Sequence, residues 1–244
     1  MLGSSATRRV LLLWMAVCLS VLLVSAGSLA QTTSVPQAPD TMAARMEACT
    51  PCHGTDGQGT SNDYFPRIAG KPAGYLYNQL NEFHIGQRRY APMNYLFEFL
   101  PDPYLHDIAD YFASLHPPAP APLPPTVSPE VLARGESIVM HGDGAREIPA
   151  CASCHGRMLT GMEPAIPALI GLRANYISAQ LGGWRYGTRT AKAPDCMQLV
   201  AARLTEADVT AVAAYLSAQS VPPESKPLPA GTLALPFACG SEPQ

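Results

Sequence analysis

Two copies of a five-residue motif constrain this chain more than any other feature. Residues 49–53 read Cys-Thr-Pro-Cys-His, and residues 151–155 read Cys-Ala-Ser-Cys-His. This C-x-x-C-H spacing is the attachment signature of a c-type haem, because two thiols three positions apart can form thioethers to both vinyl groups of one porphyrin. The imidazoles of His53 and His155 then become the proximal ligands of the iron. The motifs predict two covalent haem c groups, attached through Cys49, Cys52, Cys151 and Cys154.

Two other uses of a C-x-x-C pair are a redox dithiol and half of a zinc site. A dithiol of the thioredoxin type expects a βαβ context, and no alternating β-branched run surrounds either motif. A four-cysteine zinc site joins two pairs about a hundred residues apart and leaves both trailing histidines without a role. Haem attachment is therefore the favoured interpretation.

The start of the chain has the pattern of an export signal. Arg8 and Arg9 precede an apolar run over residues 10–24, and small residues follow as far as Ala30. This order predicts a signal peptide over residues 1–30, cleaved after Ala30, and a periplasmic protein. The alternative is an uncleaved membrane anchor. The formal net charge of −3 gives no indication of a nucleic-acid partner.

One unit occurs twice along the chain. The segment from Pro66 to Arg88 matches a segment 101 residues later, which begins at Pro167 and ends at Arg189. The matched positions include a tyrosine, a Gln-Leu pair and a glycine in each copy. An internal repeat of this kind indicates a duplicated domain.

The repeat divides the chain into four segments after the signal peptide. We expect a first domain over 31–116, a proline-rich linker over 117–128, a second domain over 129–220 and a proline-rich C-terminal tail over 221–244. Proline-rich stretches favour extended polyproline II backbone, so the linker is expected to act as a semi-rigid connection between the domains. The tail is expected to pack over the surface or to be partly disordered.

Within each unit the pattern is helical, and few strand signals compete with it. Helix starts are indicated by Asp40, by Asp102 followed by proline, by Ser128 followed by proline, and by Thr205 with Asp208 in a capping box. We therefore expect an all-α protein with long loops around each haem.

A haem with one histidine leaves the sixth iron position open. Met93 is the only methionine between the first haem motif and the linker, 40 residues after its histidine. In the second unit Met158 and Met162 lie too close to His155, whereas Met197 follows it by 42 residues. The matched spacing predicts Met/His ligation twice, with core packing as the alternative role of each methionine. Such ligation suits electron transfer rather than substrate binding.

Several other side chains have a predicted role around the haems. The carbonyl groups of Pro66 and Pro167 are placed to accept the Nδ1–H of the axial histidines, the alternative being ordinary loop prolines. Trp184 and Tyr186 are expected to pack in a haem pocket. Four arginines are candidates for pairing with haem propionates or are solvated: Arg88, Arg89, Arg185 and Arg189. Four histidines are expected to lie at the surface: His84, His106, His116 and His141.

These residues resemble those of the dihaem cytochrome c4 family. The resemblance covers nearly all of the chain after the signal peptide, including residues 66–70, 133–136 and 148–156. It implies two tandem class-I cytochrome c domains related by a pseudo-twofold axis, with the haem propionates facing one another. It also implies a periplasmic carrier, soluble or membrane-associated, that passes electrons to a terminal oxidase. By position, the axial pairs are His53 with Met93 and His155 with Met197.

Two cysteines remain after haem attachment and loss of Cys18 with the signal peptide. Cys196 and Cys239 are unusual for the resembled family, and the default in an oxidising compartment is a disulfide. We expect them to pair and to hold the tail across the methionine side of the second haem. Free buried thiols, an intermolecular bridge and a reactive thiolate remain as alternatives.

The favoured function is a two-centre electron carrier with an upstream redox donor and a terminal oxidase as acceptor. The first alternative is the cytochrome subunit of a dehydrogenase complex, such as a flavin-dependent sulfide-oxidising one. The second is an enzyme, either a dihaem thiosulfate dehydrogenase or a peroxidase. Catalysis needs a labile or unusual distal ligand, and Cys196 beside Met197 is the one feature that hints at it.

Overall fold

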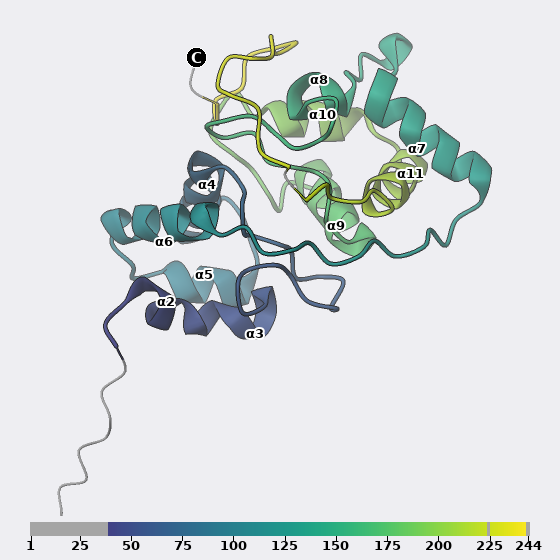
Figure 1. Cartoon of the computed structure of the whole chain (residues 1–244). Coiled ribbons are helices and arrows are strands. Elements are labelled where there is room, and N and C mark those ends of the chain that lie inside the picture. Colours follow the sequence, from purple (N-terminus) through teal and green to yellow (C-terminus); the bar gives the residue numbers. More distant parts are fainter. Residues whose placement is uncertain (1–38, 224, 243–244) are drawn as a thin grey trace, which may run out of the picture. The chain divides into compact units, whose positions relative to one another are not determined.

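The computed structural model describes residues 39–223 and 225–242, and every regular element within those ranges is a helix. The predicted signal peptide lies outside the described residues. The helices fall into two groups, one around each haem motif (Figure 1). The first group comprises α2 (Met42–Arg45), η2 (Met46–Cys49), α3 (Thr50–His53), α4 (Ala73–His84), α5 (Ala91–Phe97) and α6 (Asp102–Ser114). The second comprises α7 (Pro129–His141), η3 (Gly144–Arg146), α8 (Cys151–His155), α9 (Ala174–Arg185), α10 (Cys196–Arg203) and α11 (Glu206–Ser217). The predicted all-α class is confirmed.

The predicted caps are correct in the second half, whereas in the first half the helices begin within one or two residues of the predicted positions but Asp40 and Asp102 are not their caps. The Ser128 side chain accepts a hydrogen bond from the Val131 N–H, and Thr205 with Asp208 forms the capping box of α11. Asp40 does not cap α2, because the hydroxyl of Thr41 accepts from the Ala44 N–H instead. Asp102 is the first residue of α6 rather than its cap, which leaves its carboxylate free to accept from Tyr77.

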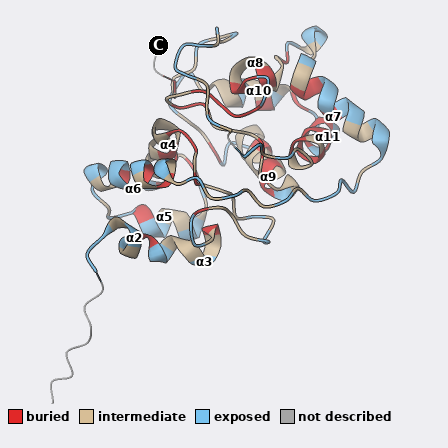
Figure 2. Ribbon diagram, viewed as in Figure 1, coloured by how far each residue is buried: buried red, intermediate tan, exposed pale blue. Residues whose placement is uncertain are grey.

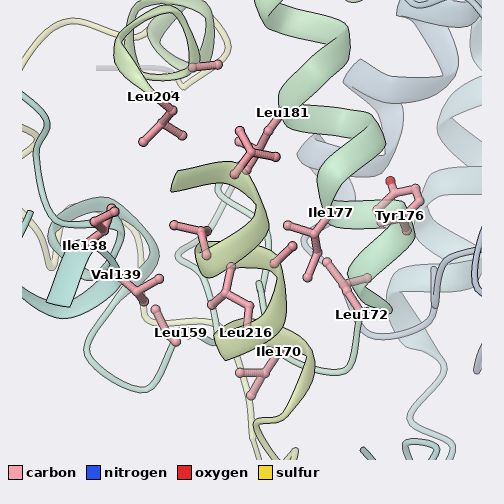
Figure 3. Close-up of a cluster of buried hydrophobic side chains, with 14 of the residues drawn as sticks. Ile138, Val139, Leu159, Ile170, Leu172, Tyr176, Ile177, Leu181, Leu204 and Leu216 are labelled. Carbon is pink, nitrogen blue, oxygen red and sulfur yellow. The ribbon is translucent and has the colours of Figure 1, made fainter. Parts of the chain in front are cut away.

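Each half has its own apolar core. In the first half α4 packs on α6, and in the second α11 packs on α7 and α9. Figure 2 shows the buried residues on the facing sides of these helices, with the outer sides of α6 and α7 exposed. Gly135 allows α7 to lie against the α11 backbone, because a β-carbon there would collide with the Ala211 carbonyl. Figure 3 shows Ile138 and Val139 of α7, Ile177 and Leu181 of α9 and Leu216 of α11 around the second core.

The proline-rich segment between the halves contains no helix. Its backbone carbonyls accept hydrogen bonds from two arginines. The Arg67 guanidinium donates to Pro117 and Pro118, and the Arg173 guanidinium donates to Ala121. The segment is thus bound to both halves, which fits the semi-rigid linker predicted from its proline content. Among residues 39–223 and 225–242, no helix has the length and apolar character needed to cross a membrane.

Candidate haem sites

The structure contains two chambers, each lined by one haem motif and one of the predicted methionines. Cys49, Cys52, His53 and Met93 line the cavity in the first half, which we call the first chamber. Cys151, Cys154, His155 and Met197 line the cavity in the second half, the second chamber. The remaining lining is mostly apolar in both, as a flat porphyrin requires.

Each haem motif ends in a short helix whose last residue is its histidine, although Cys49 of the first motif belongs to η2. Pro51 lies in the first turn of α3, where its missing N–H has no helical partner to lose. Gly54 and Gly156 follow the two histidines with φ of 83° and 80°. A side chain at either position is strained in that conformation, so glycine ends the helix and turns the chain away. The histidine is thereby held at the helix end with both cysteines on the preceding turn.

Both axial histidines are oriented by a proline carbonyl. His53 Nδ1 lies 2.9 Å from the oxygen of Pro66, and His155 Nδ1 lies 2.8 Å from the oxygen of Pro167. A carbonyl oxygen can only accept, so Nδ1 carries the proton and the lone pair of Nε2 is free for a metal. Burial lowers the pKa of His53 and lowers the pKa of His155 to about 4, despite the hydrogen bonds to proline. Both imidazoles are therefore neutral at physiological pH, which is the form that binds iron.

The two methionines lie on short helices fixed by polar side chains. Asn94, next to Met93, donates to the carbonyls of Phe83 and Arg88 and accepts from the Tyr90 N–H. Asp195 caps the helix of Met197 by accepting from the Gln198 N–H. Met158 is 66% exposed, and neither it nor the buried Met162 lines a chamber.

Cys196 and Cys239 are joined by a disulfide in the structure, with their Cα atoms 5.0 Å apart. Both residues line the second chamber. The bond links the C-terminal tail to the residue directly before Met197.

The chambers share a wall that includes two repeat-equivalent pairs, Tyr75 with Tyr176 and Gln79 with Gln180. Six side chains line both cavities, namely Lys71, Tyr75, Gln79, Tyr176, Gln180 and Arg189. Arg88 donates to the carboxamide oxygens of Gln79 at 2.9 Å and Gln180 at 2.7 Å. Arg189 donates to the same two oxygens, at 2.5 Å and 2.9 Å respectively. The exchange of partners between the copies is what a pseudo-twofold axis requires.

The backbone and the aromatic rings repeat this symmetry. The Arg89 N–H donates to the Thr188 carbonyl, and the Thr190 N–H donates to the Gln87 carbonyl. The guanidinium of Arg88 lies over the ring of Phe83, and that of Arg189 lies over the ring of Trp184. Each of these pairs maps onto the other by the 101-residue offset.

Two buried donors on the wall of the second chamber fit a group that carries carboxylates. Trp184 Nε1 and Arg189 Nε are buried and have no hydrogen-bond partner within the part of the chain that the structure describes. Both residues line the second chamber. Unpaired buried donors are costly, and the propionates of a haem are acceptors that satisfy them. The side chains present therefore fit haem c.

The remaining predicted residues divide between buried and exposed positions. Arg88 and Arg189 are buried in the shared wall rather than solvated, whereas Arg89 is exposed and Arg185 is half-buried beside the ring of Tyr186. The prediction that Tyr186 packs in a haem pocket is wrong. Its ring is 68% exposed, and its hydroxyl donates to Glu206. None of the four histidines expected at the surface lines a chamber.

Residues that the sequence did not single out for a role also belong to the wall. Gln79 and Gln180 are the shared acceptors of the arginine pair, and their conservation between the two copies was the available signal. Lys71 and Glu82 are buried, and both line the second chamber. Burial, reinforced by nearby Arg67, lowers the pKa of Lys71 to about 7. Burial raises the pKa of Glu82 to about 7, against the effect of the two wall arginines.

Comparison with known proteins identifies the family. No protein-family model matches the chain. The chain is 38% identical over 177 residues to a thiosulfate dehydrogenase electron acceptor of Thiomonas intermedia, covering 72% of this chain and 80% of that protein. It is 35% identical over 175 residues to cytochrome c4 of Pseudomonas aeruginosa, covering 71% and 84%. The crystal structure of reduced recombinant cytochrome c4 from Pseudomonas stutzeri matches with a TM-score of 0.63 and 30% identity, over 72% of this chain and 95% of that one.

These relatives transfer electrons and are not enzymes, so the alternative that this chain is itself a thiosulfate dehydrogenase or a peroxidase is set aside. The chain consists of two tandem class-I cytochrome c domains and carries two covalently attached haem c groups. The repeated motifs, the paired chambers and these similarities show together that the chain belongs to the dihaem cytochrome c4 family.

Proposed function

We propose that this protein is a periplasmic carrier that accepts electrons from a thiosulfate-oxidising dehydrogenase and delivers them to a terminal oxidase. The observation that carries the electron-transfer part is the pair of chambers, each lined by one haem motif and one methionine. When bound, each haem supplies an iron that is reduced and oxidised by one electron at a time. The protein supplies the ligands, the orientation and the exclusion of water.

The proposed axial ligands are His53 with Met93 and His155 with Met197. Covalent attachment falls to the four motif cysteines, and the carbonyls of Pro66 and Pro167 keep each imidazole in the tautomer with Nε2 unprotonated. A thioether opposite an imidazole raises the reduction potential and fills the sixth position. Two filled sites leave no position for a substrate, which supports a carrier.

The shared wall supports transfer between the two centres. Six residues line both chambers and so form a boundary that the two cavities have in common. The guanidinium groups of Arg88 and Arg189 are fixed by both glutamines, so the wall is held from both halves. A boundary held rigidly in this way needs little reorganisation when charge moves across it.

The donor is proposed from the relatives. The protein of Thiomonas intermedia is named as the electron acceptor of a thiosulfate dehydrogenase, and its similarity to this chain extends over 80% of its length. The periplasmic location is proposed because the relatives are c-type cytochromes, whose haem is attached outside the cytoplasm in bacteria, and because residues 1–30 have the composition of a signal peptide.

The donor is tested by anaerobic stopped-flow spectroscopy of the oxidised holoprotein. We expect thiosulfate with a purified thiosulfate dehydrogenase to reduce both haems, at a rate proportional to the enzyme concentration. Thiosulfate without the enzyme is the control and is expected to leave the spectrum unchanged. Reduction no faster than this control would overturn the proposed donor. Reduction by a sulfide-oxidising flavoprotein instead would favour the dehydrogenase-subunit alternative.

The acceptor is tested separately with the fully reduced holoprotein. Membranes that contain a cytochrome c oxidase are expected to oxidise it in air, and cyanide is expected to stop that oxidation. Oxidation at the same rate with and without membranes would contradict the oxidase as acceptor.

A further inference from the structure

The C-terminal tail forms an irregular strap, which we define as residues 228–242; it turns at residues 230–231 and lies along the second chamber from Leu235 onward. Figure 1 shows this segment, in yellow, running back from α11 toward α8 and α10. Four of its alternate residues line the chamber, namely Leu235, Phe237, Cys239 and Ser241. Of the residues between them, Pro236 and Ala238 are exposed and Gly240 is half-buried, and Ala234, just before Leu235, is also exposed. The alternation over residues 234–239 shows that one side of this segment is turned toward the chamber and the other toward solvent.

The strap is fixed at both ends. Near its start, the Leu228 N–H donates to Gly161 at 2.9 Å and its carbonyl accepts from the Glu163 N–H at 2.8 Å. Near its end, the Cys239 disulfide and a 2.9 Å hydrogen bond from the Gly240 N–H to Pro194 bind it beside the helix of Met197.

The last two described residues extend these attachments. The buried Glu242 carboxylate accepts from the Ala165 N–H at 3.0 Å, and the Ser241 carbonyl accepts from Asn78 of α4 at 3.0 Å. Since Asn78 belongs to the first half, the strap is bound to both halves of the molecule. Its position is therefore fixed by more than the disulfide.

The first chamber has no such cover. Among the described residues that line it, none comes from the strap. Tyr64 and Leu96 line it instead, and they are 41% and 45% exposed. The repeat thus gives two chambers with the same ligands and different walls.

We propose that the strap is the outer wall of the second haem site, and that Leu235 and Phe237 exclude water there and keep Met197 on the iron. This inference depends on the proposed ligation by Met197. Leu235 and Phe237 are positioning residues, because they act through the methionine and the dryness of the chamber. An apolar wall disfavours the more positively charged ferric state, so it raises the reduction potential of the second haem. The disulfide fixes the inward register of the strap next to the ligand.

The test compares Phe237→Ser with Ala238→Ser, which place the same polar side chain on the inward and outward faces of the strap. The readouts are a redox titration of both haems and carbon monoxide binding to the reduced holoprotein. We expect Phe237→Ser to lower the potential of the second haem and to make that haem bind carbon monoxide. Ala238→Ser is expected to match the wild type. The first haem serves as an internal control for folding, because its potential is expected to remain unchanged in both variants.

A second variant removes the strap after Pro227 and carries Cys196→Ser, so that no free thiol remains beside the iron. We expect a larger fall in the potential of the second haem and loss of its iron–thioether absorption band. An unchanged second haem in both Phe237→Ser and the shortened chain would overturn the inference. That outcome leaves the proposed function intact, since reduction by the dehydrogenase is measured on the wild-type protein. Conversely, if the dehydrogenase fails to reduce the wild-type protein, the potentials from the redox titrations of the strap variants are unaffected.

Discussion

Arg88 lies in an antiparallel β-bridge with Arg189, its counterpart 101 residues later in the chain. Each guanidinium binds the carboxamide oxygens of both Gln79 and Gln180, so each glutamine is shared between the two halves. A buried cation needs acceptors for its donors, and here the acceptors of the terminal guanidinium nitrogens come from both domains. The arginine pair therefore ties the relative position of the domains to the integrity of the wall between the haem chambers.

This symmetry predicts that Gln79→Leu and Gln180→Leu destabilise the folded protein by equal amounts. Each change removes the acceptor of two buried N–H groups, which costs about 1–3 kcal/mol for each group left unsatisfied. We expect both variants to lower the free energy of unfolding by similar amounts in denaturant titrations. Gln198→Leu, at an exposed position of α10, is the control and is expected to have little effect. A large difference between the two wall variants would contradict the shared arrangement.

If Met93 and Met197 are the iron ligands, replacing either one should remove half of the iron–thioether absorption. In Met93→Ala the first haem loses its thioether, and in Met197→Ala the second does. We expect each variant to retain about half of the far-red iron–thioether absorption of the oxidised wild-type protein. Met158→Ala is the control, because its side chain is 66% exposed and lies outside both chambers. A full band in Met93→Ala or Met197→Ala would exclude that residue as a ligand.

Glu82 predicts a pH-dependent potential for the second haem. Burial raises the pKa of this carboxyl to about 7, and its equivalent in the other copy is Gly183, so the effect is confined to one chamber. The ionised carboxylate stabilises the ferric charge more than the neutral acid does, because opposite charges attract more strongly in a dry site. The potential of the second haem should therefore fall as pH rises through about 7 and then level off.

The matched variant for this prediction is Glu82→Gln, which keeps the shape of the side chain and removes its titration. Redox titrations at several pH values between about 6 and 8 are expected to show a flat second-haem potential in this variant. An equal slope in Glu82→Gln and in the wild-type protein would show that another group is responsible.

Asp208 predicts an acid-sensitive second domain. Its side chain is fully buried, and it accepts from Arg134, Arg146 and the Thr205 N–H. Burial alone acts to raise the pKa of this carboxyl, but the hydrogen bonds from Arg146 and Thr205 outweigh it and hold the pKa well below its usual range. The unfolded chain takes up a proton near pH 4, before the folded one does. The stabilisation is therefore complete above about pH 4 and is lost progressively below it.

We expect Asp208→Asn to lower the free energy of unfolding by roughly 2 to 4 kcal/mol at neutral pH, through loss of the capping box and both ion pairs. Its stability should also decrease less steeply with acid than that of the wild-type protein. Asp107→Asn, at an exposed position of α6, is the matched control. Parallel acid-unfolding curves for Asp208→Asn and the wild type would contradict this role.

Sequence reasoning succeeded where one local pattern dictates the structure. The haem motifs and the 101-residue offset anticipated the two chambers, and the proline-containing starts at Ser128 and the box at Thr205 were visible because capping is local. The cap predictions for Asp40 and Asp102 were wrong. The Thr41 hydroxyl caps α2 in place of Asp40, and the Asp102 carboxylate accepts from Tyr77 instead of capping α6. The contact of Asp102 with Tyr77 is tertiary and is not visible in the local pattern, whereas Asp40 loses to its immediate neighbour Thr41.

The tail and the wall were less accessible to sequence reasoning. The alternation from Leu233 to Cys239 is present in the sequence, but the prolines around it obscured that one side of the segment faces the chamber. Tyr186 follows Trp184 by only two positions in the sequence. It lies past the end of α9, however, and faces solvent. The reciprocal arginine–glutamine bonds needed the structure, because the repeat shows equivalence and not proximity.

Carbon monoxide binding to the fully reduced wild-type holoprotein tests the central claim most directly. If both irons carry histidine and methionine, neither has a free position, and the visible spectrum should remain unchanged as the gas is added near neutral pH. Rapid, stoichiometric binding at either haem would contradict the account, because it would show an open iron site where the chain is proposed to exchange only electrons.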